Sequence, residues 1–256
     1  NFPDPRLAGN DDRDQFAAVV AHEFGHFGGG DSRFAGWVYR LRTTWASIQH
    51  ALAMRGGMFA RAFSGFFGWY APYFDAYSFV LARANEYGAD AVSARVVGAP
   101  AAASALVRVR VGADALASEF WPGVQRAVAR QPEPPRLLQA QVAARLRTPA
   151  PDDAARLANA LAEIADHRDT HPSLRERLEA LGQPATLPPP PAASAAEVLL
   201  GPLLATIETE LSERWRQAVN DGWQLGHKTL REDRARFDTL DAIGPQTLEE
   251  RRDYAR

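Results

Sequence analysis

Apolar residues recur every three or four positions through most of the chain, a spacing typical of amphipathic α-helices. No segment shows a convincing two-residue alternation, so the pattern predicts a mainly α fold with little or no sheet. The first helix is expected to begin near Asp12, because Asp12 and Gln15 form a capping-box pattern. It should end at the glycines 28–30, and its apolar positions predict that one face is buried.

Three more helices are predicted over 32–54, 58–70 and 74–97. The middle one should end at Tyr70, because Pro72 disfavours a helical conformation in Ala71, the residue before it. Gly98 is the predicted C-cap of the last one. From 100 to 181, shorter helical patterns alternate with proline clusters.

The stretch GQPATLPPPPAAS, residues 182–194, is rich in proline and predicts a stiff linker. Beyond it, amphipathic helices are expected over 195–236 and 245–256, with Trp215 and Trp223 facing a partner surface. The last helix lacks a stop signal, so this region is interpreted as the start of a helical-repeat array. The predicted domain limits are therefore 1–183, a linker over 184–194, and a helical C-terminal region over 195–256.

The amino-acid composition says little about the fold, but it excludes several kinds of functional site. The 256 residues are 46% hydrophobic and 23% charged with a formal net charge of −2, an ordinary globular balance that does not favour nucleic-acid binding. The chain has no cysteine, which excludes disulfides, a thiol nucleophile and a thiolate metal site. It shows no signal peptide and no run of about 20 apolar residues, so the chain itself is expected to be soluble.

The sequence AHEFGHF, residues 21–27, places two histidines four positions apart on the first predicted helix. His22 and His26 then project from one face, so both imidazoles can reach one metal ion. In NEYGADA, Glu86 and Asp90 have the same spacing. A zinc hydrolase needs three protein ligands, and Glu86 would complete a His2Glu set. Asp90 can accept the second ring N–H of a ligating histidine.

Three motifs, HEFGH, EYGAD and THPSLRERL, follow one another in an order that resembles the HtpX-like and CAAX-prenyl-protease-like zinc metallopeptidases of the gluzincin group. The resemblance covers about Gln15 to Leu181 and implies a zincin-like helical core. It implies that one zinc ion is bound by His22, His26 and Glu86. It also implies that Glu23 is the general base, that Asp90 supports a ligand, and that His171 and Arg177 line the site.

The expected function is that of an endopeptidase in which Glu23 takes a proton from a zinc-activated water. His171 is the candidate for stabilising the oxyanion, and Arg177 for orienting carboxylates such as Asp90. The polypeptide substrates are expected to be membrane-associated or misfolded proteins. Two other classes stay open: a binding or chaperone module whose C-terminal helices recognise partner proteins, and a structural zinc protein without turnover. The remaining histidines, His50, His167 and His227, are assigned to surface or packing.

The interval between His26 and Glu86 predicts an inserted helical hairpin. Membrane-embedded relatives carry transmembrane helices there, whereas the aromatic run AFSGFFGWYAPYF is too short to span a bilayer. Such an aromatic run is more often plain core, and the nearby arginines leave membrane-surface contact through 57–77 open as the alternative. The 21 residues before the metal helix cannot supply the family's upstream membrane helices, so the sequence is interpreted as a fragment of a membrane-associated bacterial protein.

Overall fold

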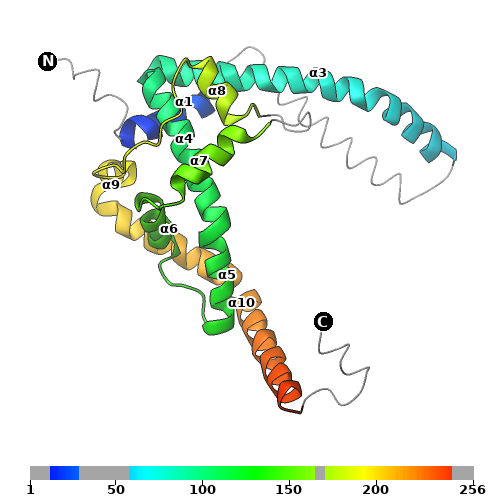
Figure 1. Cartoon of the computed structure of the whole chain (residues 1–256), viewed down its shortest axis with the longest axis vertical. Helices are drawn as coiled ribbons and strands as arrows, with labels where there is room; N and C mark the ends of the chain where they lie inside the picture. Colours follow the sequence, from blue (N-terminus) through cyan, green and yellow to red (C-terminus); the bar gives the residue numbers. More distant parts are fainter. Residues whose placement is uncertain (1–11, 29–57, 165–170, 244–256) are drawn as a thin grey trace. The chain divides into compact units, whose positions relative to one another are not determined.

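The computed structural model describes residues 12–28, 58–164 and 171–243. Within these ranges every regular element is a helix and no strand occurs, which confirms the predicted mainly α fold (Figure 1). The helices predicted over 32–54 and 245–256 lie outside the described residues. The chain divides into two compact units, Asn1–Gly112 with Ala150–Val198 and Ala113–Pro149 with Leu199–Arg256.

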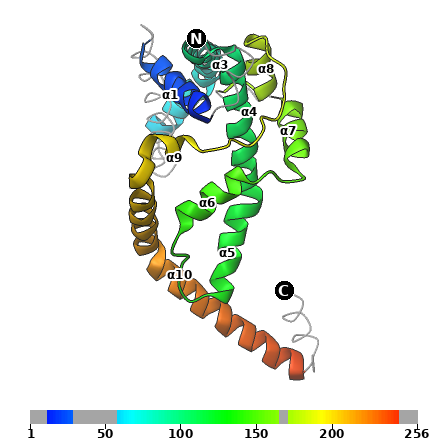
Figure 2. The same cartoon turned by 90° about the vertical axis from the view of Figure 1, so that its left-hand side faces the viewer.

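In the first unit, α1 (Asp12–Gly28) packs along α3 (Met58–Val97), and the two helices lie side by side in both views (Figures 1 and 2). The bounds of α1 confirm the first predicted helix. The two helices bury small side chains, among them Ala18 of α1 and Ala89 of α3. The Ser93 hydroxyl donates to the Ala18 carbonyl oxygen over 2.9 Å. Small residues at a crossing let two helix backbones approach closely.

The predicted break before Pro72 is wrong, because α3 continues as one helix of 40 residues. A proline inside a helix lacks one N–H and disfavours helical geometry in the preceding residue, at a cost of about 3 kcal/mol. The chain is helical on both sides of Pro72, so this local penalty does not end the helix. The segments 58–70 and 74–97 therefore belong to one element.

Gly98 separates α3 from α4 (Ala99–Ala115) and confirms the predicted C-cap. Its φ of +87° lies in the left-handed region that glycine tolerates, and its N–H donates to the Ala94 carbonyl over 2.9 Å. The core of the first unit lies where α4 meets α7 (Asp153–Ala162) and α8 (Leu174–Ala180). It consists of Ala103, Val107, Val111, Leu157, Ala160, Leu174 and Leu178.

The proline-rich stretch that follows α8 has no regular secondary structure over residues 183–191. It is nevertheless tied to the first unit. The Arg108 guanidinium donates to the Pro189 carbonyl over 2.7 Å, and the Ala195 N–H donates to the Asp12 carboxylate over 2.6 Å. These contacts anchor the segment to α4 and to the start of α1.

The second unit contains a π-helical turn, η1 (Leu116–Phe120), and the helices α5 (Trp121–Arg130), α6 (Leu138–Arg147) and α10 (Leu204–Ile243). The Trp223 indole N–H donates to the Gln131 carbonyl over 2.8 Å, so this tryptophan packs within the unit. Its ring meets the Trp215 ring edge to face at 6.5 Å. The buried Ser212 hydroxyl accepts the Gln139 N–H over 3.3 Å.

The predicted continuous helix over 195–236 is also wrong. The chain forms α9 (Ala195–Leu200), a 3₁₀ turn η2 (Gly201–Leu203) and then α10. Gly201 has a φ of +51°, and the proline after it cannot donate a backbone hydrogen bond, so the α-helix is interrupted there. Among the described helices, none is long and apolar enough to cross a membrane.

Candidate metal centre

The predicted site residues line one cavity of about 340 Å³ in the first unit. Helix α1 supplies His22, Glu23 and His26, and α3 supplies Glu86 and Asp90. His171 and Arg177, from the segment before α8 and from α8 itself, complete the polar part of the lining. Residues as far apart in the sequence as His22 and Arg177 therefore line the same cavity.

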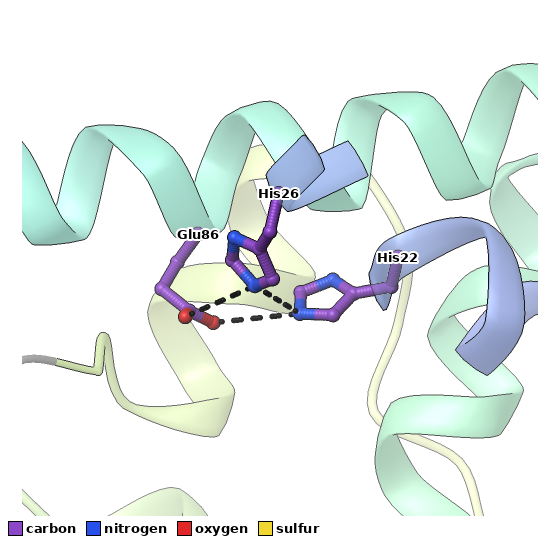
Figure 3. A group of neighbouring side chains, drawn as sticks. All are labelled: His22, His26 and Glu86. Carbon is purple, nitrogen blue, oxygen red and sulfur yellow. Dashed lines mark hydrogen bonds and ion pairs between the residues drawn. The ribbon is translucent and has the colours of Figure 1, made fainter. Parts of the chain in front are cut away.

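His22, His26 and Glu86 point toward one another from two helices (Figure 3). The Nε2 atoms of His22 and His26 lie 3.2 Å apart. The Glu86 carboxylate lies 3.6 Å from the His22 Nε2 atom and 3.5 Å from the His26 Nε2 atom. Zinc bonds of about 2.0–2.1 Å in a tetrahedron require ligand atoms about 3.3 Å apart. The three side chains therefore fit a single zinc ion as they stand.

Asp90 sets which ring nitrogen of His22 faces the other two ligands. The His22 Nδ1 atom lies 2.9 Å from the Asp90 Oδ1 atom. An ionised carboxylate only accepts hydrogen bonds, so Nδ1 carries the proton and donates it. The Nε2 atom of His22 then keeps its lone pair, which is the form that binds a metal ion.

Arg177 holds this carboxylate in its charged form. Its guanidinium donates twice to Asp90, over 2.8 Å from Nε and 2.6 Å from Nη2. Burial alone would raise the pKa of Asp90, but the hydrogen bonds from Arg177 and His22 outweigh burial and hold the pKa below its ordinary value. Burial likewise lowers the pKa of Arg177, and the bonds to Asp90 more than compensate, so its pKa is raised.

Glu23 and His171 are the two exposed polar groups of the cavity lining. Glu23 follows His22 and stands about 100° around α1 from it, so it lies beside the ligand face. The His171 Nδ1 atom lies 3.1 Å from the Glu86 Oε1 atom, although 65% of the His171 side chain is exposed. Both groups therefore border the three candidate ligands and remain open to solvent.

Of the other three histidines, His227 is the one within the described residues. His227 belongs to the second unit, where its Nδ1 atom is 2.6 Å from the Val128 carbonyl oxygen. This packing contact is of the kind expected for it. His50 and His167 lie outside the described residues.

Sequence reasoning missed a contact between α3 and the start of α8. The Arg83 guanidinium donates to Glu176 over 2.5 Å, and Glu176 also closes the capping box of α8 with Ser173. Burial alone would raise the pKa of Glu176, but the hydrogen bonds from Arg83 and Ser173 together outweigh burial and hold the pKa below its ordinary value. Arg83 precedes Glu86 by three positions and therefore lies on the same face of α3. This spacing is the feature of the sequence that could have predicted the contact.

The family model of Peptidase family M48 matches residues 6–185, which include every candidate site residue. The chain belongs to peptidase family M48. No curated protein and no solved structure matches the chain. Membership in family M48 confirms the resemblance found in the three motifs and supports a metallopeptidase function with a polypeptide substrate. Among the described residues, the acidic and histidine side chains that could hold a metal ion form one group of three: His22, His26 and Glu86.

Proposed function

We propose that the chain is a zinc-dependent endopeptidase. The observation that carries this proposal is the convergence of two imidazole Nε2 atoms and one carboxylate within 3.2–3.6 Å of one another. Two histidines and a carboxylate without cysteine form a donor set that suits zinc and leaves room for a further ligand. The three ligands would be His22, His26 and Glu86. When bound there, zinc supplies activation of water and polarisation of the substrate carbonyl.

Glu23 acts as the general base in this proposal. Its carboxylate lines the cavity beside the ligand set without belonging to it. A carboxylate in that place can take a proton from the attacking water and pass it to the leaving amine nitrogen. Glu86 cannot share this work, because both of its oxygens are directed at His22, His26 and His171.

His171 is proposed to stabilise the oxyanion that forms on the substrate. It stands at the edge of the cavity, close to Glu86 and partly in solvent. A donor placed there can meet the developing negative charge without a change in the fold. The alternative role is that of a reversible fourth ligand that keeps the enzyme idle. Arg177 is a positioning residue, since it acts on the substrate only through Asp90 and Glu86.

The cavity wall next to these groups is apolar and supports a preference for apolar substrate side chains. Helix α4 contributes Leu106 and Val109 to the lining, and α1 contributes Val19. Val109 is 57% exposed, so its side chain is accessible from solvent. An aliphatic or aromatic side chain beside the scissile bond would lose water on entering this wall. Exposed segments of membrane-associated or misfolded proteins offer such side chains.

A binding or chaperone role for the C-terminal region is the second candidate function. The observation that favours it is the set of exposed apolar side chains on α10, which are Leu211, Leu225, Leu230, Phe237 and Leu240. Exposed apolar side chains on a long helix can serve a protein partner. The domain limits 1–183, 184–194 and 195–256 remain part of the proposal, as does membrane association of a longer protein. The family match, which ends at residue 185, supports the first limit.

The experiment compares the wild type with Glu23→Gln after both are stripped of metal and reloaded with zinc. We expect both proteins to bind about one zinc per chain. The rate of hydrolysis of a casein or quenched-peptide substrate should fall by about 100-fold or more in Glu23→Gln. The matched control is Glu179→Gln, which removes a charge from an exposed glutamate of α8 outside the cavity lining. A wild type with zinc but no turnover would favour the binding or structural alternatives.

A further inference from the structure

Both metal-bearing motifs contain a glycine, and their surroundings differ completely. Gly25 lies in HEFGH on α1, and Gly88 lies in EYGAD on α3. A Cβ atom added at Gly25 would lie 2.8 Å from the Ala89 Cα atom, closer than real Cβ contacts. A Cβ atom added at Gly88 would meet no atom within 4 Å. Only one of the two glycines is therefore required by packing.

We infer that Gly25 is a positioning residue for the metal centre: its missing side chain sets the distance between the two helices that carry the ligands. This inference rests on the proposed zinc site. Gly25 directly precedes His26 and follows His22 by three positions. Ala89 stands three positions after Glu86 and directly before Asp90. This close contact between the two helices thus lies at the level of the ligands themselves.

A metal site tolerates only small changes in the distances between its ligands, so the contact at Gly25 affects metal binding directly. Relief of the contact to an ordinary 3.4 Å would require a shift of about 0.6 Å between the backbones. Metal–ligand distances in a working site stay within about 0.2 Å of their usual values. The obstacle is the backbone Cα atom of Ala89, which cannot rotate away as a flexible side chain would. A shift of that size would separate Glu86 from the two imidazoles.

A second contact holds the same crossing two turns earlier along α1. The buried Ser93 hydroxyl donates to the Ala18 carbonyl over 2.9 Å, which joins α3 directly to the backbone of α1. His22 lies between this contact and the one at Gly25. With the helices held at Ser93, added bulk at residue 25 would tilt them apart near His26 and Glu86.

The test is a competitive zinc titration of Gly25→Ala and Gly88→Ala against a chromogenic chelator. Alanine is the better helix former, so helix propensity alone would favour both variants. We expect the zinc dissociation constant of Gly25→Ala to rise by about 10-fold or more, the scale seen when groups that orient a ligand are lost. That of Gly88→Ala should stay within about twofold of the wild type. Circular dichroism and thermal unfolding of the metal-free proteins show that each variant is folded.

If Gly25→Ala does not fold, Ala89→Val carries the same test, because it adds bulk to the same contact from α3. A folded variant of either kind that binds zinc as the wild type does would overturn the inference. Loss of folding in both variants would also overturn it, since the contact would then hold the whole unit rather than the ligand geometry. A wild type that binds no zinc would overturn the proposed function and this inference together.

Discussion

The two ends of α3 differ in which side chains they bury: acidic side chains are buried at one end, and aromatic side chains are exposed at the other. Near its C-terminal end, Glu86 and Asp90 are only 7% and 3% exposed. In its N-terminal half, Trp69 and Tyr73 are 63% and 65% exposed. Both ends belong to one helix, so helical periodicity alone does not determine which side chains are buried.

The difference follows from what each end contacts. A buried carboxylate is costly unless charged or hydrogen-bonding partners surround it. Asp90 has two such partners in Arg177 and His22, and Glu86 faces both candidate ligand histidines. Large exposed aromatic side chains instead mark surfaces that serve a partner. The C-terminal part of α3 therefore carries the candidate metal ligand Glu86, whereas the N-terminal part exposes aromatic side chains that could serve a partner surface.

The largest expected effect concerns His171, the exposed side chain that contacts Glu86 at the C-terminal end of α3. His171→Ala should retain zinc while the rate of peptide hydrolysis falls by about 10- to 1000-fold, because a group that stabilises the oxyanion is lost. Zinc content and single-turnover rates measure the two effects separately. A rise in rate would identify His171 as a blocking ligand instead, and an unchanged rate would reject both roles.

The second prediction concerns Asp90 and asks whether this buried carboxylate contributes to zinc affinity. Asp90→Asn should weaken zinc binding by about 10- to 100-fold, because the amide no longer orients His22 as a carboxylate does. A chelator titration measures the zinc affinity. The control is Asp221→Asn, which makes the same change at an exposed position on α10. Equal zinc affinity in Asp90→Asn and the wild type would show that Asp90 is buried for another reason.

A smaller effect is expected at the apolar wall beside the site. Val109→Glu should slow the cleavage of peptides with an apolar residue at the scissile bond by about tenfold, because a charge enters a wall that holds apolar side chains. Val96→Glu is the matched control, since Val96 is 64% exposed on α3 and does not line the cavity. Equal slowing by both variants would contradict the assigned substrate preference.

The smallest effect concerns the aromatic end of α3. The wild type should float with anionic vesicles, less so at high salt, because salt screens the attraction between charges. The double variant Trp69→Ala/Tyr73→Ala should reduce the bound fraction by about fivefold, since two aromatic side chains are lost from the interface. Trp121→Ala, in the second unit, should bind as the wild type does. Identical flotation of all three proteins would assign the aromatic end to packing.

Local spacing predicted the parts of the site that depend on one helix at a time. The pairs His22–His26 and Glu86–Asp90 follow from the four-residue repeat, and the bounds of α1 follow from its cap and its glycines. The convergence of the two pairs came only from the three ordered motifs, because periodicity does not specify how two helices cross.

The errors and omissions have physical causes of the same kind. Pro72 does not end α3, because a local preference is weaker than the hydrogen bonds of the long helix around it. Gly201 and its proline do interrupt the C-terminal helix, where a positive φ lies beside a missing donor. The distinct roles of Gly25 and Gly88 depend on where the neighbouring helix passes, which a single sequence does not reveal.

The most direct test of the central claim is a zinc titration of the metal-free wild type, followed by X-ray absorption at the zinc edge. The wild type should bind one zinc per chain, coordinated by two imidazole nitrogens and a carboxylate oxygen. Glu86→Gln should lose the stoichiometric zinc, whereas Glu179→Gln should keep it. Binding of less than one zinc per chain, or a spectrum without two imidazoles, would contradict the claim that α1 and α3 together form the zinc site.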